Sequence, residues 1–226
     1  MTVNVTNALE SIKSLSLFND SSFYFIGGTA LAYYLQHRIS EDIDIISNQT
    51  LPYKNIIATI QSIGGRKLRD ENAFALRLAG LFPDEYMLKF DLHGVKLEFF
   101  KASTLIQNRI VADATITKYC DSKLNILDVK SIAKLKLLAL LSRNKSRDIF
   151  DFKTILENKI LNDSEILEIA SQSNKEIKSL KHFYDFILNI EQPKDDEAVY
   201  LDEDKPINLT FEEIKENTLS VMKSWS

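Results

Sequence analysis

The sequence has 226 residues, of which 45% are hydrophobic and 27% charged, with a formal net charge of −4 and a pI near 5.5. This balance is typical of a globular protein and excludes fibrous or disordered chains, while the negative charge argues against sequence-blind coating of nucleic acid. The single cysteine, Cys120, cannot form an intramolecular disulfide. The N-terminus lacks the features of an export signal, and no apolar run approaches the roughly 20 residues that cross a bilayer. We therefore expect a cytoplasmic protein with no membrane partner.

The first half of the chain begins with alternating helix and strand patterns. Apolar residues at helical spacing predict a helix over residues 5–18. An aromatic and apolar run, Phe23–Ile26, predicts a buried strand that ends at Gly27–Gly28. A helix then opens at Thr29, and a second strand follows in which Asp42 and Asp44 alternate with isoleucines. The order is therefore strand, turn, helix, strand.

The middle of the chain changes its hydrophobic period from helical to two. Pro52 opens a predicted helix that continues to residue 63 and ends at Gly64–Gly65. Residues 67–70, 74–78, 86–92 and 95–100 are then predicted to be strands, with a hairpin turn over residues 91–94. The first half is therefore an α/β arrangement with antiparallel additions.

The second half is predicted to be helical. Helical periodicity begins near residue 128 and recurs over residues 148–159, 163–171 and 175–190, with a last helix from 211 to about 222. Seven acidic residues between positions 191 and 205 predict an exposed acidic linker. We place a domain change near residue 125. The predicted fold class is α+β, with a mixed sheet and flanking helices in residues 1–125 and a helical C-terminal domain in residues 126–226.

Asp42 and Asp44 are the first candidate metal ligands. Because they are two apart on a predicted strand, their side chains leave the same face and reach one cation. Mg²⁺ prefers such hard oxygen ligands, with waters and substrate phosphates completing its shell, and Mn²⁺ is the alternative. By itself the pair is a weak signal, because two exposed acids give the same pattern.

The Gly27–Gly28–Thr29 turn lies 15 residues before the acidic pair. Glycines allow the backbone to approach a phosphate closely, and the helix that follows directs free N–H groups at an anion. Thr29 adds a hydroxyl. A tight turn with no ligand is the alternative, but the combination with Asp42 and Asp44 favours a nucleotide site.

Glu98 is the candidate for the third carboxylate of a two-metal phosphoryl-transfer site. It stands between Leu97 and Phe99 on a predicted strand, so it faces either the site or the solvent. Asp91, close to the hairpin turn, is a weaker substitute.

Two segments resemble a known family. The run GGTALAYYLQHRISEDIDII, residues 27–46, resembles the opening motif of the AbiEii/AbiGii toxin nucleotidyltransferases of the polymerase-β-like superfamily. The run KLKLLALLSRNKSRDIFDF, residues 134–152, resembles the second signature of that family. The resemblance implies a polymerase-β-like nucleotidyltransferase core followed by a helical domain.

Residue by residue, the resemblance implies that Gly27, Gly28 and Ser40 bind nucleotide and that Asp42 and Asp44 bind metal. It further implies that Lys136 contacts the triphosphate and that Asp148 assists catalysis or orients that lysine. The alternative for Lys136 is a surface lysine beside an apolar face. Arg38 matches a recurrent family position, which indicates either a phosphate contact or a contact at a helix end.

Ion pairing is the alternative role for Asp148 and for Asp151, three residues later. The six basic residues between positions 130 and 147 either attract an RNA backbone or solvate one helix face.

The resemblance implies transfer of a nucleoside monophosphate from a nucleoside triphosphate to an acceptor, either RNA such as tRNA or a protein hydroxyl. It also implies a toxin of a type IV toxin–antitoxin or phage-defence system, with a cognate antitoxin as partner. A small-molecule nucleotidyltransferase acting on aminoglycoside-like compounds is the first alternative. Because the family usually has Asp where this chain has Glu98, a catalytically inactive module that binds a nucleotide or a partner is the second.

Overall fold

The computed structural model describes residues 1–20, 22–69, 73–173, 175, 177–201 and 208–226. These residues form two compact units. The first unit comprises Met1–Tyr34 and Ser40–Asp128, and the second comprises Leu35–Ile39 and Val129–Ser226. The short segment Leu35–Ile39 therefore belongs to the second unit, although the chain on either side of it belongs to the first. The sequence pattern does not predict this exchange.

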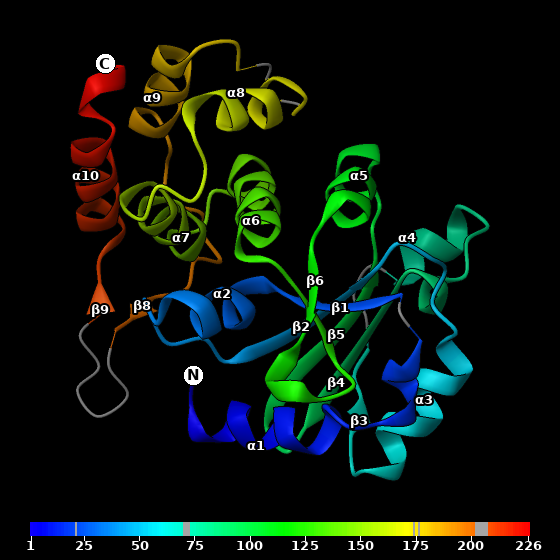
Figure 1. Cartoon of the computed structure of the whole chain (residues 1–226). Helices are drawn as coiled ribbons and strands as arrows, with labels where there is room; N and C mark the ends of the chain where they lie inside the picture. Colours follow the sequence, from blue (N-terminus) through cyan, green and yellow to red (C-terminus); the bar gives the residue numbers. More distant parts are fainter. Residues whose placement is uncertain (21, 70–72, 174, 176, 202–207) are drawn as a thin grey trace. The chain divides into compact units, whose positions relative to one another are not determined.

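The first unit is built on a seven-stranded mixed sheet (Figure 1). Its strands in spatial order are β3, β4, β5, β2, β1, β7 and β6. The parallel pairs are β2 with β5 and β1 with β7, and the other neighbours are antiparallel. The bounds are β1 (Phe23–Ile26), β2 (Asp42–Ser47), β3 (Arg66–Lys67), β4 (Met87–Leu92), β5 (Val95–Lys101), β6 (Ile116–Lys118) and β7 (Asn125–Leu127).

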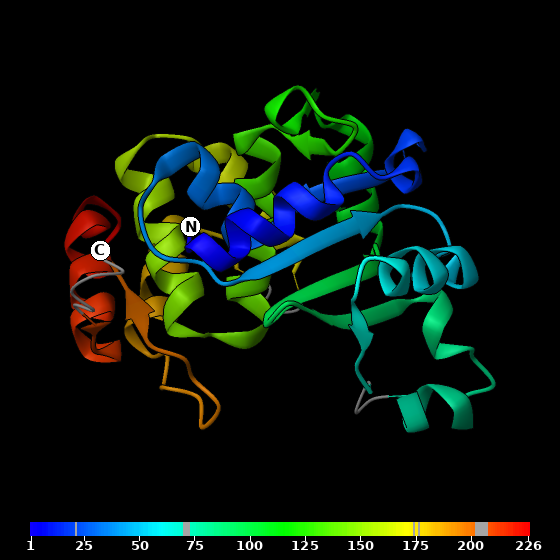
Figure 2. The ribbon, with the colours of Figure 1, turned by 90° about the horizontal axis from the view of Figure 1, so that it is seen from below.

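The helices of the first unit are short, and α1 and α3 contact different parts of the sheet. Helix α1 contacts β2 and β5, and Figure 2 shows it alongside β2, whereas α3 contacts β3 and β4. Fully buried side chains of α1, β2 and β5, among them Leu9, Ile43 and Phe99, form this core. The bounds are α1 (Val3–Ile12), α2 (Gly27–Leu35), α3 (Tyr53–Ser62), α4 (Ala73–Leu78) and α5 (Leu105–Asp113).

The alternating pattern of β2 and β5 separates an apolar face from a charged one. Ile43 and Ile45 are fully buried, whereas Asp42 and Asp44 on the opposite face are half-buried.

Strands β4 and β5 form a hairpin that turns at His93 and Gly94. These two residues have φ angles of 55° and 82°, and a two-residue hairpin turn requires such positive values. The predicted hairpin is therefore correct.

Three predictions for the first unit need correction. The helix predicted over residues 5–18 ends at Ile12, because Leu15 is extended before a short 3-10 turn, Ser16–Asn19. Residues 74–78, predicted as a strand, lie in α4. The strand predicted over 67–70 is Arg66–Lys67, and position 70 lies outside the described residues. Helix α5 and strands β6 and β7 were not predicted.

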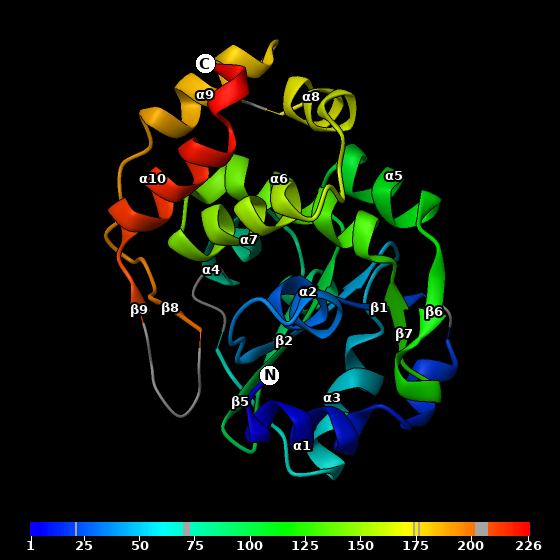
Figure 3. The same ribbon diagram turned by 60° about the vertical axis from the view of Figure 1, so that its left-hand side comes forward.

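The second unit is helical (Figure 3), with α6 packed against α7 and α8, and α10 packed against α7 and α9. Its helices are α6 (Val129–Arg143), α7 (Ser146–Glu157), α8 (Asp163–Ser171), α9 (Leu180–Leu188) and α10 (Phe211–Val221). Strands β8 (Val199–Tyr200) and β9 (Asn208–Leu209) pair antiparallel in a separate two-stranded sheet. None of the helices in the described part of the chain combines the length and the apolar character that spanning a membrane requires.

Two predictions for the second unit also differ from the structure. The helix predicted from residue 175 begins at Leu180, because the Ser179 side chain accepts a hydrogen bond from the backbone of His182 and caps it. The described part of the predicted acidic linker, residues 191–201, is mostly exposed, as expected, but it is attached to the start of α7, and positions 202–205 lie outside the described residues. Asp196 accepts hydrogen bonds of 2.9 Å and 2.6 Å from the backbone and hydroxyl of Ser146, and Val199 is buried.

Candidate active site

Asp42 and Asp44 lie on β2 and project from its charged face. In the register of the sheet, Asp42 is opposite Lys96 of β5 and Asp44 is opposite Glu98. On the other side of β2, Asp44 is opposite Ile26, the last residue of β1. The chain turns at this residue into α2, so the sheet register brings the start of that helix next to Asp44.

Gly27 makes direct contact between the turn and the carboxylate possible. It has a φ angle of 82°, and an added Cβ would lie 2.8 Å from the carboxyl carbon of Asp44 and would overlap its Oδ2. The Asp44 carboxylate therefore occupies the space that a side chain at position 27 would fill. The structure thus places the glycine turn and Asp44 against one another, as a phosphate and metal site needs.

We predict that Gly27→Ala lowers the stability of the protein more than Gly94→Ala. Both glycines have a φ angle of 82°, so both substitutions carry a backbone strain of about 1–2 kcal/mol. Only position 27 adds a steric overlap, because no heavy atom lies within 4 Å of a Cβ built at Gly94. We expect a further loss of about 1–3 kcal/mol in urea unfolding followed by circular dichroism. Equal losses in the two variants would refute the close contact with Asp44.

Thr29 and Ser40 are buried next to this turn. The Thr29 hydroxyl donates a hydrogen bond to the carbonyl oxygen of Asp42, and it shares a second one, of 2.9 Å, with the Ser40 hydroxyl. The Thr29 hydroxyl thus fastens α2 to the start of β2, and the Ser40 hydroxyl is bonded to Thr29. The nucleotide contacts expected of both residues remain predictions.

Glu98 lies on the same face of the sheet as the two aspartates and is ion-paired with lysines. Its carboxylate is 2.9 Å from Nζ of Lys96 and 3.8 Å from Nζ of Lys89 on β4. Among the described residues, no three His, Cys, Asp or Glu side chains are gathered closely enough to hold a metal ion together. The role of Glu98 as a third ligand remains a prediction.

The second unit contains a buried ionic cluster around Asp151, whose side chain is fully buried. Its carboxylate accepts hydrogen bonds of 2.7 Å and 3.0 Å from Nε and Nη2 of Arg38, and its Oδ1 is 2.7 Å from Nε2 of His37. Nζ of Lys136 lies 2.8 Å from the same carboxylate. Burial alone raises the pKa of Asp151, but the charges of Arg38 and Lys136 and the hydrogen bonds from His37 and Arg38 hold this pKa well below its ordinary value.

Asp148 forms the other half of this cluster. It is also fully buried, accepts hydrogen bonds of 2.6 Å and 2.9 Å from Arg143, and lies 3.8 Å from Nζ of Lys136. Lys136 is 7% exposed and lies between two carboxylates. It is therefore not a lysine on an exposed surface.

The structure thus groups the predicted residues into two sets. The first unit contains Gly27, Gly28, Thr29, Ser40, Asp42, Asp44 and Glu98. The second unit contains Arg38, Lys136 and Asp148. Sequence reasoning left out Lys96 and His37, and it assigned Asp151 only a structural ion pair. The register of the strand identifies Lys96, because it lies two residues before Glu98 and hence on the same face.

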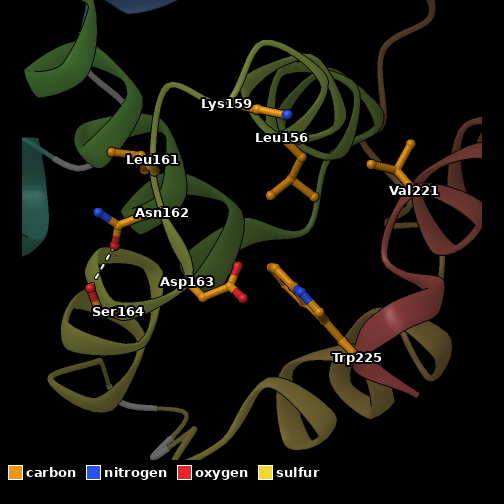
Figure 4. Close-up of a pocket in the computed structure, with 8 residues that line it drawn as sticks. All are labelled: Leu156, Lys159, Leu161, Asn162, Asp163, Ser164, Val221 and Trp225. Atoms are coloured by element: carbon orange, nitrogen blue, oxygen red, sulfur yellow. Dashed lines mark hydrogen bonds between the residues drawn. The ribbon is translucent and has the colours of Figure 1, made fainter.

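A hollow of about 560 Å³ lies in the second unit, apart from these residues (Figure 4). Its polar groups include the start of α8, where the Asn162 side chain caps the helix and accepts a 2.6 Å hydrogen bond from Ser164. None of the predicted site residues lines it. The lining residues are Leu156, Lys159, Leu161, Asn162, Asp163, Ser164, Val221 and Trp225.

Comparison with solved structures identifies the class of fold. The chain is similar to JHP933 from Helicobacter pylori, with a TM-score of 0.52 and 16% identity over 99% of this chain and 90% of that one. It is also similar to an H. pylori protein described as a candidate nucleotidyltransferase, with a TM-score of 0.50 and 13% identity over 100% of this chain and 96% of that one. The chain thus shares its fold with these two proteins.

The sequence comparisons identify the family. Residues 13–217 match the family described as nucleotidyl transferase AbiEii toxin, type IV TA system. The chain therefore belongs to the AbiEii family of nucleotidyltransferase toxins. An uncharacterized protein of Aquifex aeolicus (strain VF5), aq_aa25, is 28% identical over 185 residues, which cover 79% of this chain and 81% of that protein.

Proposed function

We propose that the protein transfers a nucleoside monophosphate from a nucleoside triphosphate to a macromolecular acceptor, either an RNA such as tRNA or a protein hydroxyl. The observation that carries this proposal is the placement of Asp42 and Asp44 on one face of β2, with the Asp44 carboxylate against Gly27 at the start of α2. Membership of the AbiEii family supports the reaction class.

The donor set of the first unit fits Mg²⁺ or Mn²⁺. Two aspartates share a face, and the next strand adds Glu98 beside Asp44, so carboxylates are concentrated where a hard cation is favoured. A divalent ion there would stabilise the charge that develops as pyrophosphate leaves. The residues that would hold it are Asp42 and Asp44, with Glu98 as the third ligand.

Different groups of the chain are proposed to bind the phosphates, to position Asp42 and to supply positive charge. Gly27 and Gly28 would let the phosphates approach the backbone, and the N–H groups at the start of α2 would bind an anion at that turn. Thr29, which is hydrogen-bonded to Ser40, holds the backbone of Asp42 in place. Lys136 is proposed to contribute positive charge for the triphosphate, with Asp148 and Asp151 fixing its orientation.

We further propose that the protein is the toxin of a type IV toxin–antitoxin or phage-defence system and that a cognate antitoxin restrains it. The family description supports the toxin role. Co-expression with the product of an adjacent reading frame should then restore the growth of cells that produce the protein.

A label-transfer assay tests the proposed reaction. The purified chain is incubated with each α-labelled nucleoside triphosphate, Mg²⁺ and either total RNA or a protein extract. We expect label in one of the two acceptors and an equivalent release of pyrophosphate. Chelation of the metal should abolish both, and added Mg²⁺ or Mn²⁺ should restore them. Absence of label and of pyrophosphate with all four triphosphates would refute the proposal.

A further inference from the structure

The geometry points to Lys96 as a built-in cation of the carboxylate site, which disfavours a free divalent ion and favours one that arrives with a triphosphate. This inference rests on the proposed metal site at Asp42 and Asp44. It assigns Lys96 a selective role that neither the sequence motif nor the family description contains.

The register of the sheet places Lys96 among the acids. Strands β2 and β5 are parallel neighbours, with Asp42 opposite Lys96 and Asp44 opposite Glu98. Residues opposite one another on adjacent strands are roughly 5 Å apart and project from the same face. One patch of the sheet therefore has an acid at three of its four corners and a base at the fourth. The acids are Asp42, Asp44 and Glu98, and the base is Lys96.

The contacts of Lys96 show that its charge is directed into this patch. Its Nζ is 2.9 Å from Oε2 of Glu98, and its side chain is 44% exposed. An ordinary lysine has a pKa of about 10.4, so the ammonium group carries its charge at neutral pH.

On the far side of Lys96, β4 carries an acid that is paired with another partner, Asp91, and a second cation that faces Glu98, Lys89. Asp91 of β4 is opposite Lys96 in register, but its Oδ2 is 2.8 Å from Nη2 of Arg66. Lys89 of β4 is 3.8 Å from Glu98. Across β3, β4, β5 and β2, the row Arg66, Asp91, Lys96, Asp42 alternates in sign. In the next row, Lys89, Glu98 and Asp44, two acids are neighbours.

This arrangement has opposite effects on the two forms of the metal. A free divalent ion is repelled by the ammonium group and competes with it for Glu98. A metal–triphosphate complex carries net negative charge, so the same ammonium group attracts it. Removing the charge should therefore strengthen the binding of free metal and weaken the binding of the metal–nucleotide complex. A purely structural role of Lys96 would not give effects of opposite sign.

The test compares Lys96→Met, which keeps the apolar stem, with Lys96→Arg, which keeps the charge. Binding of Mn²⁺ to the full chain is measured by electron paramagnetic resonance without nucleotide. Binding of Mn²⁺ with a non-hydrolysable triphosphate analogue is measured by calorimetry. We expect Lys96→Met to bind free Mn²⁺ about tenfold more tightly and the Mn²⁺–analogue complex about tenfold more weakly. Lys96→Arg should stay within about threefold of the wild type in both measurements.

Two further variants keep the outcome interpretable. Lys101→Met changes a lysine at the end of the same strand that is hydrogen-bonded to Thr50, and it should leave both affinities unchanged. Lys96→Gln repeats the loss of charge with a polar side chain, so a folding defect of Lys96→Met does not decide the test. If Asp44→Asn binds Mn²⁺ as well as the wild type does, the proposed metal site itself is wrong. If the wild type binds specifically and neither neutral variant shows the opposite shifts, only the role of Lys96 is overturned.

Discussion

Asp44→Asn should abolish nucleotidyl transfer while the protein remains folded. Asp44 is the acid that lies against Gly27, and it neighbours Glu98 across the sheet, so we expect it to contribute most to holding the metal. Replacing a metal ligand removes several kcal/mol of charge stabilisation in the transition state, which corresponds to a loss of about a thousandfold or more. Initial rates of label transfer at saturating Mg²⁺ measure this loss.

Asp91→Asn is the matched control for this experiment. Asp91 is an acid on the same face of the sheet, but it is paired with Arg66 near the hairpin turn. We expect its rate to stay within about twofold of the wild type, since exposed ion pairs contribute little. Thermal unfolding of both variants should show no large loss of stability. A full rate for Asp44→Asn, or an equal loss in Asp91→Asn, would contradict the assignment.

Asp151→Ala should destabilise the second unit far more than Asp195→Ala. The substitution leaves Arg38 and Lys136 buried without the carboxylate that balances them. Breaking a buried ion pair by removing one partner typically costs about 3–5 kcal/mol. Trp225, the only tryptophan of the chain, belongs to the second unit, so its fluorescence during urea unfolding follows this unit alone.

An exposed ion pair of the same unit provides the control. Asp195 is 3.0 Å from Nζ of Lys145, and its side chain is 79% exposed. Asp195→Ala should therefore change the stability by about 0–1 kcal/mol. Similar losses in the two aspartate variants would show that the Asp151 cluster contributes no more than a surface pair.

The pH dependence of this difference follows from the pKa of Asp151. Because that pKa lies well below its ordinary value in the folded chain, the carboxylate contributes its full stabilisation above roughly pH 4, where it is ionised in the unfolded chain as well. The stabilisation is lost as the pH falls towards the depressed pKa. The difference in stability between the wild type and Asp151→Ala should therefore be constant near neutral pH and shrink only in acid.

The central strands could be predicted from the sequence because their patterns have one interpretation. Phe23–Ile26 is a continuous apolar run before two glycines, and Asp42–Ser47 alternates acids with isoleucines. The segment around α4 has two interpretations, because Phe74 and Leu78 share a face at a spacing of four in either a strand or a helix. Both side chains are more than 70% exposed, so no burial in a core selects the strand.

The buried cluster of the second unit depends on contacts that no local pattern encodes. Arg38 and Asp151 are 113 residues apart in the sequence, and the hydrophobic period of α7 does not predict which acid is buried. The short strands β6 and β7, three residues each, carry too few side chains for a detectable alternation. The motif residues of the first unit were predictable because turn chemistry and strand period fix them locally.

The assignment of Leu35–Ile39 to the second unit affects how the protein matures during synthesis. The backbone N–H of Ile39 bonds to the carbonyl of Tyr200, and Arg38 bonds to Asp151, so this segment must wait for residues that leave the ribosome more than a hundred positions later. A fragment that begins at residue 129 lacks the guanidinium group that neutralises Asp151. Recombinant halves cut at the apparent boundary should therefore be poorly soluble, whereas the same C-terminal fragment mixed with a peptide spanning residues 35–39 should recover part of its order.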